Sequence, residues 1–432
     1  MVRWRILALL VAFALVGYVQ RTSVAIAAER MMPLLGLSQV QVGELLTVFL
    51  IGYTIFQVPG ALAGHWLGAR RTITAIGLVT VAATCATCLA PQLQFPVLLF
   101  PALLCSRFVL GVAQAALFPV ASGAIEDWFP AGSWAYAQGL VIAGIWIGTA
   151  ATPPGIAYLM GHWSWEVALY ATSIPSVLLI VVWQWYARDR PAEHSGVGAA
   201  ELVQVRRNLP GHAEGGMALR LALQLRHNRE LMLITFSYFL MNYVFYLVTF
   251  WCFLYLVQDR HFSILESGLL ASLPFLAAAV AAPAGGRLCD ALCARFGIRL
   301  GMRVIPLVTL PMAALFLYLT VAATNPYWAV VALSAAFAGV ELNEGPFWAA
   351  AMRVAPANTM NATAVLNTGG NLGGVVATPI IAALSASHSW HSVFATGAVL
   401  SVAAAILWIW IDVRDQFAAD VLKPRAEGAP NA

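Results

Sequence analysis

Long apolar runs alternate with short polar connections along the chain, and these runs define the predicted elements. Twelve of them approach the roughly 20 residues that a helix needs to cross a bilayer. They cover residues 6–27, 43–64, 72–89, 97–120, 135–158, 165–186, 231–256, 264–286, 304–323, 327–351, 362–384 and 392–412. Because the runs are continuous rather than alternating, they predict spanning helices and exclude the strands of a transmembrane barrel.

The composition places these helices in lipid. Apolar residues make up 61% of the 432 and charged residues only 10%, against about 45–50% and about 25% in soluble globular chains. No soluble fold has enough interior to bury so much apolar surface. The expected fold class is an all-α polytopic membrane protein with twelve transmembrane helices in two six-helix halves.

One long polar stretch, residues 187–229, separates six runs from the other six. We therefore expect an N-terminal six-helix bundle over 1–186, a cytoplasmic central loop over 187–229 and a C-terminal six-helix bundle over 230–413. The polar segment 414–432 is expected to be a disordered cytoplasmic tail.

The basic residues indicate how the helices are oriented. If the N-terminus is cytoplasmic, 19 of the 23 Lys and Arg fall on the cytoplasmic side, while Arg30 and Arg260 fall on the other. Arg21 and Arg107 lie inside apolar runs. The excess of positive charge on one side predicts cytoplasmic N- and C-termini, in a bacterial inner (plasma) membrane.

Two connections in equivalent positions indicate an internal repeat. The connection after the second run reads PGALAGHWLGARR (59–71), and the one after the eighth reads GGRLCDALCARFGIRLGMR (285–303). In both connections a Gly lies near the end of the apolar run, and a second Gly followed by Arg comes after it. This pattern is expected when two six-helix halves are related by an axis along the membrane normal, with the substrate site between them at the midplane.

Several short segments, taken in their order and spacing, resemble one known family. They read Tyr18-x-x-Arg21-Thr22-Ser23-Val24-Ala25, LGLSQVQVG (35–43), GYTIFQVPG (52–60), RFVLGVAQAALFP (107–119), DWFP (127–130), RDRPAEH (188–194), LMNYVFYLVTFW (240–251), EGPFWAA (344–350) and NTGGNLGGVVATP (367–379). With them the chain resembles the major facilitator superfamily, in its anion:cation symporter branch of sugar-acid and organic-anion permeases. The resemblance implies transport by alternating access.

Arg21 and Arg107 are the first candidate substrate-binding residues. An Arg at bilayer depth costs at least about 2.5–3.5 kcal/mol, so each is expected to face a cavity or a partner. The planar guanidinium also matches a carboxylate, and the family similarly uses the Arg of the first helix to hold one. The alternatives are that Arg21 reaches the outer interface and that Arg107 bonds backbone carbonyls.

Two acids that the resemblance implies are missing. Many family members have an Asp before the first Arg and a Glu seven residues after the second, and these resemble the groups that carry a coupled proton. Here the positions are Gln20 and Gln114, which keep hydrogen bonding but cannot titrate. They remain candidates for substrate binding.

Glu341 and Glu344 are two acids inside the apolar run 327–351. They lie three residues apart and so nearly on one helix face. Two carboxylates this close in a low dielectric repel each other, which makes one a candidate proton carrier for a relocated coupling site. The alternative is that one of them pairs permanently with an Arg across the bundle.

Further polar residues in the apolar runs complete the predicted substrate site. Tyr53 and Gln57 lie one turn apart, as do Asn367 and Asn371, and buried polar groups in lipid must find partners in a neighbouring helix or in a ligand. The resemblance adds Trp348 to the substrate contacts, with core packing as its alternative.

The predicted gates lie in the repeated connections. His65 occupies the position where most family members have the Asp that locks the outward-open state, together with Arg70 and Arg71. The second half keeps the acid as Asp290, followed by Arg295. We therefore expect a weak lock in the first half.

The sequence favours a secondary active transporter of an organic carboxylate anion. In one form of this prediction, transport of the anion is coupled to a proton. An uncoupled facilitator of the same substrates and a non-transporting membrane sensor are the alternatives. We find no nucleophile–base pair, metal cluster or phosphate loop, so no enzyme activity, cofactor or metal is expected. The expected partners are the substrate, a proton and the lipid bilayer, without nucleic acid, and the expected state is a monomer.

Overall fold

The computed structural model describes residues 1–92, 96–206, 225–356, 358–386 and 390–414, and this part of the chain is almost entirely helical. The first half contains α1 (Val2–Leu35), α2 (Gln39–Ile55), α3 (Gln57–Leu89), α4 (Pro96–Ala115), α5 (Leu117–Trp128), α6 (Trp134–His162) and α7 (Trp165–Tyr186), with the 3₁₀ turns η1 (Ala90–Gln92) and η2 (Ala131–Ser133). The connecting segment forms η3 (Pro191–Glu193), α8 (Ala199–Arg206) and η4 (Leu225–His227). The second half contains α10 (Arg229–Gln258), α11 (Ile264–Leu270), α12 (Ser272–Phe296), α13 (Ile298–Ala322), α14 (Pro326–Glu341), α15 (Glu344–Val354), α16 (Thr359–Ala386) and α17 (Trp390–Leu407).

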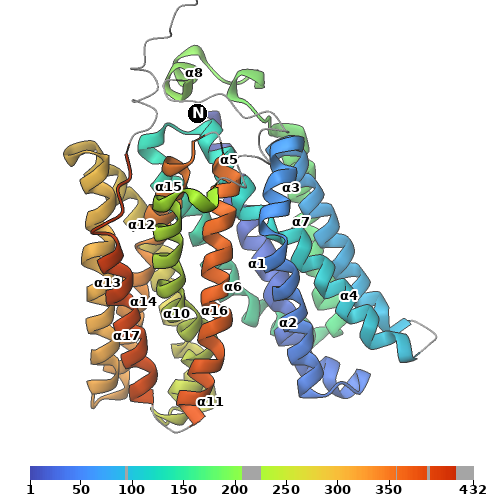
Figure 1. The fold of residues 1–432 in the computed structure, drawn as a ribbon. Coiled ribbons are helices and arrows are strands. Elements are labelled where there is room, and N and C mark those ends of the chain that lie inside the picture. The colour runs from blue at the N-terminus through green and yellow to red at the C-terminus, as the bar shows by residue number, and fades with distance from the viewer. Residues whose placement is uncertain (93–95, 207–224, 357, 387–389, 415–432) are drawn as a thin grey trace, which may run out of the picture.

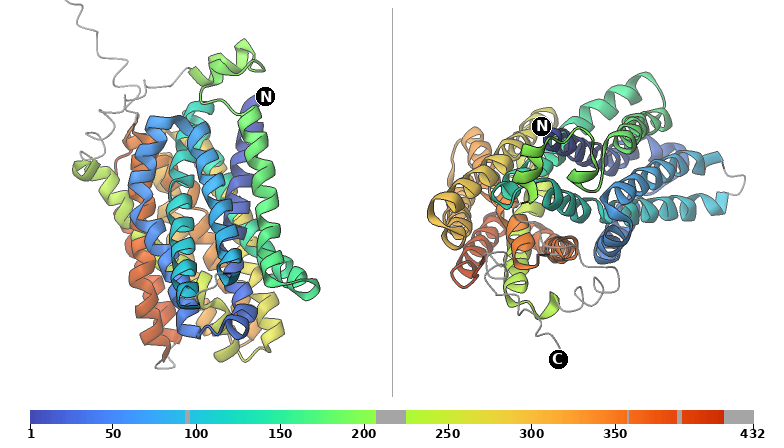
Figure 2. Two further views of the ribbon diagram at one scale, coloured as in Figure 1. Left: turned by 90° about the vertical axis from the view of Figure 1, so that its right-hand side faces the viewer. Right: turned by 90° about the horizontal axis from the view of Figure 1, so that it is seen from above.

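The helices form two bundles that stand side by side (Figures 1 and 2). In the first bundle α1 packs on α6 and α7, and α4 packs on α2 and α3. In the second, α10 packs on α16 and α17, and α13 on α14 and α17. The bundles meet mainly where α6 packs along α12 and α15 and where α16 packs on α3 and α5.

Every predicted apolar run is helical over most of its length, which confirms the fold class. Within the described residues, nine helical stretches are long and apolar enough to cross a membrane. The second and tenth runs do not reach that length as single helices, because breaks leave α2 with 17 residues and α14 with 16. The eleventh run is α16, which carries three Asn residues.

Four predicted runs are broken, and each break lies three residues before a proline. The breaks are at Phe56, Ala116, Ala271 and Asn343, and the prolines are Pro59, Pro119, Pro274 and Pro346. A proline lacks the N–H that would bond the carbonyl four residues earlier, and its ring clashes with that carbonyl. The preceding helix therefore ends there and a new one starts.

The two repeated connections turn in the same way. Gly68 has φ 79° and ψ 161°, and Gly297 has φ 84° and ψ 158°. This conformation is essentially restricted to glycine. The Gly68 turn lies inside the continuous stretch assigned to α3, and the Gly297 turn separates α12 from α13.

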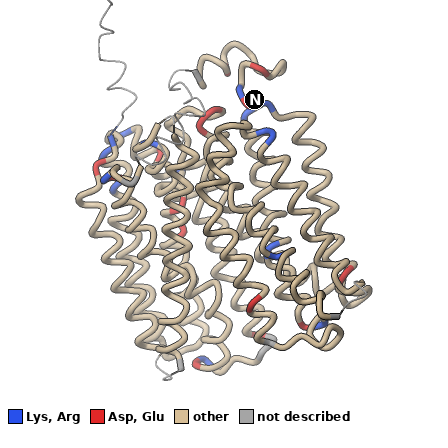
Figure 3. Tube along the Cα trace, turned by 45° about the vertical axis from the view of Figure 1, so that its right-hand side comes forward, with Lys and Arg blue, Asp and Glu red and all other residues tan. Residues whose placement is uncertain are grey.

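Most basic residues of the described part lie at the end of the bundles that holds the N-terminus, which we call the basic face (Figure 3). Its members include Arg3, Arg5, Arg70, Arg71, Arg188, Arg287, Arg295, Arg299, Arg303, Arg353 and Arg414. The expected tail over 414–432 lies outside the described residues except for Arg414, and so does 207–224 of the expected central loop.

Candidate functional site

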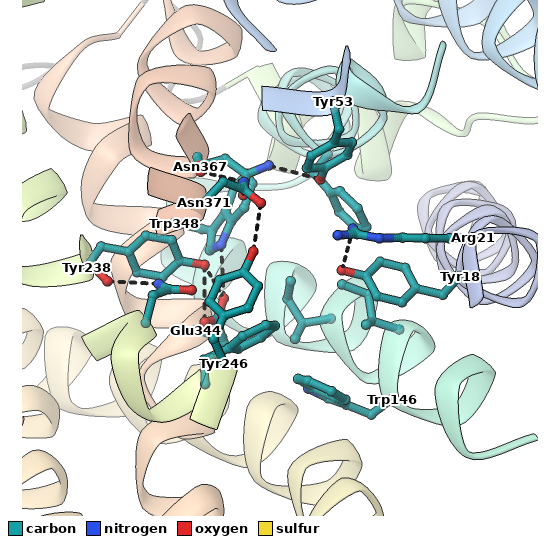
Figure 4. Close-up of a pocket in the computed structure, with 15 residues that line it drawn as sticks. Tyr18, Arg21, Tyr53, Trp146, Tyr238, Tyr246, Glu344, Trp348, Asn367 and Asn371 are labelled. Carbon is teal, nitrogen blue, oxygen red and sulfur yellow. Dashed lines mark hydrogen bonds between the residues drawn. The ribbon is translucent and has the colours of Figure 1, made fainter. Parts of the chain in front are cut away.

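A cavity lies between the two bundles near the middle of the helices, and both bundles line it (Figure 4). The first bundle contributes Tyr18, Arg21, Tyr53, Phe118, Ile142, Ile145 and Trp146. The second contributes Tyr238, Asn242, Phe245, Tyr246, Glu344, Trp348, Asn367 and Asn371. The space amounts to about 430 Å³ when the part that opens to solvent is included, and about 40 Å³ of it can hold the centre of a water-sized molecule.

Arg21 is the cation of the first wall. Its Nη1 donates a hydrogen bond to the Tyr18 hydroxyl at 3.2 Å. Its guanidinium carbon lies 4.8–5.0 Å from the ring centres of Tyr18, Phe49 and Tyr53. Ring faces attract a cation without using its N–H donors in acceptor bonds, so Arg21 keeps donors for a ligand.

Glu344 is the carboxyl of the second wall, and it starts α15 directly after the break. The Tyr238 hydroxyl lies 3.1 Å from Oε1 and 2.9 Å from Oε2, and the Trp348 Nε1 donates to Oε2 at 3.1 Å. The residue is 1% exposed. Within the described part of the chain, Glu344 forms no ion pair.

Asn367 connects the two walls. Its Nδ2 donates to the Tyr53 hydroxyl at 3.2 Å and to the Gln57 Oε1 at 3.1 Å, both in the first bundle. One turn later Asn371 accepts a hydrogen bond from the Tyr246 hydroxyl at 2.8 Å. Gln57 is fully buried and supports this contact from behind, without lining the cavity.

Arg107, Gln20 and Gln114 lie behind the first wall and are not among the lining residues. The Arg107 Nη2 donates to the backbone oxygen of Arg21 at 3.1 Å, which is the structural alternative that the sequence left open. Gln20 accepts a hydrogen bond from Ser176 at 3.0 Å, and Gln114 donates to the backbone oxygen of Gly17 at 3.2 Å. All three tie α1 to its neighbours.

Glu341 lies behind the cavity and touches it through one residue. The Nε1 of Trp146, a lining residue, donates to Glu341 Oε2 at 2.7 Å. The other oxygen accepts no hydrogen bond from the described residues. The expectation of one helix carrying both acids is wrong, because the break before Pro346 places Glu341 at the end of α14 and Glu344 at the start of α15.

At the basic face, two contacts close the bundles against each other. The Asp290 Oδ2 accepts a hydrogen bond at 2.9 Å from the backbone N–H of Tyr136, in the first turn of α6. The Arg353 guanidinium donates to the backbone oxygen of Ala131, just before α6. Arg295, which the sequence predicts as a gating residue together with Asp290, is exposed. Its guanidinium lies over the Phe296 ring, 5.3 Å from the ring centre.

The equivalent connection of the first half is held by α7. Asp189 accepts a hydrogen bond from the backbone N–H of Arg70 at 2.7 Å, and the Arg70 guanidinium donates to the backbone oxygen of Gln184. Arg71 is exposed. Gly64, next to His65, faces Met360 in the first turn of α16. His65 belongs to α3, which packs on α16, whereas Asp290 belongs to α12, which packs on α6.

The structure thus brings together Arg21, Tyr53, Trp348, Asn367, Asn371 and Glu344 of the predicted site. Sequence reasoning missed Tyr18, Trp146 and Tyr238. A signal existed for two of them, because Tyr18 lies one turn before Arg21, and Tyr238, Asn242 and Tyr246 form a polar stripe at helical spacing on an apolar helix.

Comparison with known proteins identifies relatives along the whole chain. Residues 9–377 match the family model described as Major Facilitator Superfamily. A probable sulfoacetate transporter of Cupriavidus necator is 26% identical, over 88% of this chain and 86% of its own length. A probable galactarate/D-glucarate transporter of Escherichia coli is also 26% identical, over 95% and 94%. A hexuronate transporter of Bacillus subtilis is 24% identical, over 83% of each chain.

Solved structures share the fold at low sequence identity. The proton:xylose symporter bound to 6-bromo-6-deoxy-D-glucose aligns with a TM-score of 0.74 at 13% identity, over 96% of this chain and 98% of the other. A fucose transporter in its outward conformation aligns with a TM-score of 0.70 at 12% identity, over 95% and 100%. These alignments agree with the twelve-helix arrangement that the apolar runs predict.

Proposed function

Because this chain belongs to the major facilitator superfamily of membrane transporters, we propose that it is a secondary transporter of a small organic carboxylate that works by alternating access. The observation that carries the proposal is Arg21 in the wall of a cavity between two bundles, with unused N–H donors. A bidentate guanidinium fits a carboxylate better than any other side chain. The names of the relatives, which concern sulfoacetate, galactarate/D-glucarate and hexuronate, support an organic acid.

The remaining contacts of the substrate are proposed from the same cavity. Tyr53, Asn367 and Asn371 offer hydroxyl and amide groups on both walls. Behind the lining residues, Gln57 accepts a hydrogen bond from Asn367, and hydrogen bonds of Gln20, Gln114 and Arg107 hold α1 in place. In this arrangement Arg107 positions Arg21 rather than touching the ligand.

Proton coupling is proposed to use a carboxyl of the second half, Glu341 or Glu344. Gln114 and Glu341 lie five residues before Pro119 and Pro346, so they occupy equivalent places next to equivalent breaks. The titratable group that the first half lacks is therefore present in the second. Inward movement of a monoanion alone is opposed by about 2.3 kcal/mol per 100 mV, and a co-transported proton removes that opposition.

Alternating access is proposed to exchange the closed basic face for an open one. The six-helix units over 1–186 and 230–413 would rock against each other, with 187–229 as their connection. Asp290, Arg353 and the α6 terminus form the lock in the closed arrangement. We further propose a monomer in a bacterial inner membrane with both termini cytoplasmic.

Uptake into proteoliposomes tests this function. Purified protein is first screened by thermal unfolding against sugar acids, aromatic acids and dicarboxylates, because a ligand raises apparent stability by mass action. Counterflow of the best ligand and its accumulation under an imposed pH gradient are then measured. Counterflow without accumulation would identify an uncoupled facilitator, and binding without either would refute transport.

A further inference from the structure

The two walls of the central cavity carry groups of opposite charge type. Among the described residues that line it, Arg21 is the one guanidinium and Glu344 is the one carboxyl. Arg21 comes from α1 in the first bundle and Glu344 from α15 in the second, and Figure 4 shows them on opposite sides of the cavity. The groups just behind repeat this pattern, with Arg107 behind the first wall and Glu341 behind the second.

Neither charge is neutralised by the other wall. Arg21 donates a hydrogen bond to Tyr18 and interacts with the hydroxyls of Tyr53 and Tyr246, and all three partners are uncharged. Glu344 accepts from Tyr238 and Trp348, both uncharged donors. A carboxylate has about four acceptor positions, so Glu344 can accept another donor. A buried charge without an opposite charge is costly, and a ligand that supplies one relieves that cost.

The surface around Glu344 suits a cation rather than a second anion. Its neighbours in the wall include the rings of Trp146, Tyr238, Phe245, Tyr246 and Trp348, and aromatic faces attract ammonium groups. The hydrogen-bond donors nearest to this end, Tyr238 and Trp348, are already engaged by Glu344. A second ligand carboxylate would meet Glu344 itself, and like charges in contact repel each other.

We propose that the transported carboxylate is a zwitterion, which binds with its carboxylate at Arg21 and with an ammonium group at Glu344. The proposal rests on the proposed transport function and narrows its substrate class. It assigns Glu344 to substrate recognition, which leaves Glu341 as the proton-carrying carboxyl. A ligand of this kind neutralises both walls at once and carries no net charge through the membrane.

The test compares ligands that differ only at one end. Purified full-length protein is titrated with ω-amino acids of three to six carbons, and with the unsubstituted acid, the ω-hydroxy acid and the dicarboxylic acid of each length, while thermal unfolding is followed. At the best length the amino acid is expected to bind at least about tenfold more tightly than the dicarboxylic acid. A dicarboxylic or hydroxy acid that binds as tightly at every length overturns the proposal.

A matched set of variants connects the preference to Glu344. Glu344→Gln keeps the shape and removes the charge, so it is expected to abolish the preference for the amino acid while unsubstituted acids still bind. Glu44→Gln, at an exposed position, is the control. An unchanged preference in Glu344→Gln refutes the assignment, and Glu344→Asp provides a second test if the Gln variant unfolds.

The measurements of binding and of transport can each contradict one proposal without contradicting the other. Tight binding of the amino acid without counterflow in proteoliposomes contradicts the proposed transport and leaves the zwitterion site standing. Counterflow of a dicarboxylic acid without binding of any amino acid contradicts the zwitterion and leaves transport standing.

Discussion

Gly68 and Gly297 have the same backbone conformation, with φ and ψ of 79° and 161° in one and 84° and 158° in the other. Each forms the turn that connects the second helix of its half to the third. Their surroundings differ, because a Cβ at Gly68 would lie 2.8 Å from the Asp189 carboxyl whereas a Cβ at Gly297 would meet nothing within 4 Å. The repeat is therefore conserved in backbone geometry while its contacts have diverged.

Replacing these two glycines by Ala tests the strain and the contact separately. Gly297→Ala is expected to lower the free energy of unfolding by about 1–3 kcal/mol through backbone strain alone. Gly68→Ala is expected to cost more, because it also displaces Asp189 from the Arg70 backbone N–H. Thermal unfolding in detergent measures both. Gly161→Ala in α6, where a Cβ has free space, is the control and should not destabilise; equal effects at Gly68 and Gly297 would contradict the role of Asp189.

Arg21 and Arg107 are expected to differ in their effect on binding. Arg21→Gln removes the cation that lines the cavity and should weaken binding of the best carboxylate ligand by about 1.5–3 kcal/mol, which is tenfold or more. Arg21→Lys should also bind poorly, since the two-pronged donor is lost. Arg107→Gln should bind more tightly than either, because Arg107 does not line the cavity and bonds the backbone oxygen of Arg21 instead. Ligand-dependent thermal shifts measure this order, and a stronger loss in Arg107→Gln would place Arg107 in the site.

Asp290→Asn is expected to loosen the closed basic face. The variant removes a negative charge from the N-terminus of α6, an interaction of about 1 kcal/mol, and should change the population ratio of open to closed about fivefold. Spin labels at the exposed positions 132 and 294 report the distance across this face. An unchanged distance distribution would mean that Arg353 and the packing of α6 on α12 maintain the closure.

His65→Asp is expected to act in the opposite direction. It restores a carboxylate to the connection of the first half, in the helix α3 that packs on α16. The closed population should rise by a similar factor, because an anion is favourable at a helix N-terminus. The same label pair measures the shift. No change, or a shift toward the open arrangement, would show that the first half does not use this position as a lock.

Glu341→Gln is expected to remove accumulation driven by a pH gradient and to leave counterflow intact. The side chain accepts from Trp146, and Gln can no longer carry a proton, although its oxygen can accept the same hydrogen bond. Fluxes in proteoliposomes with and without the gradient separate the two activities, with Glu44→Gln as control. Proton-driven accumulation that survives in the Glu341→Gln, Glu344→Gln double variant would exclude both carboxyls as the coupling site.

The sequence predicts the spanning helices well, because lipid requires each of them to be apolar along its whole length. It does not predict where they break. Pro59, Pro119, Pro274 and Pro346 each follow a break, yet Pro283 and Pro379 lie inside unbroken helices. Whether a proline ends a helix depends on how neighbouring helices satisfy the freed carbonyl, and that information is not local.

The candidate site was predictable where a residue type is costly in lipid. Arg21, Glu344 and the two Asn residues belong to this class, and all line the cavity. The sequence does not indicate which polar residues line the cavity and which lie behind its walls. Gln57, Gln114 and Arg107 are equally polar, yet they bond to neighbouring helices instead of lining the cavity. The choice depends on helix rotation, which packing sets.

The opposite charges of the two cavity walls have a consequence for the unloaded protein. Two walls of like charge would repel each other, so such a carrier could reorient only with a ligand bound and would perform obligatory exchange. An ionised Glu344 would attract Arg21 across an empty cavity, and this attraction would lower the energy of closing without a ligand. For the transport proposed above, we therefore expect a return step without a counter-substrate, so that uptake into an initially empty vesicle should occur and exchange should not be obligatory.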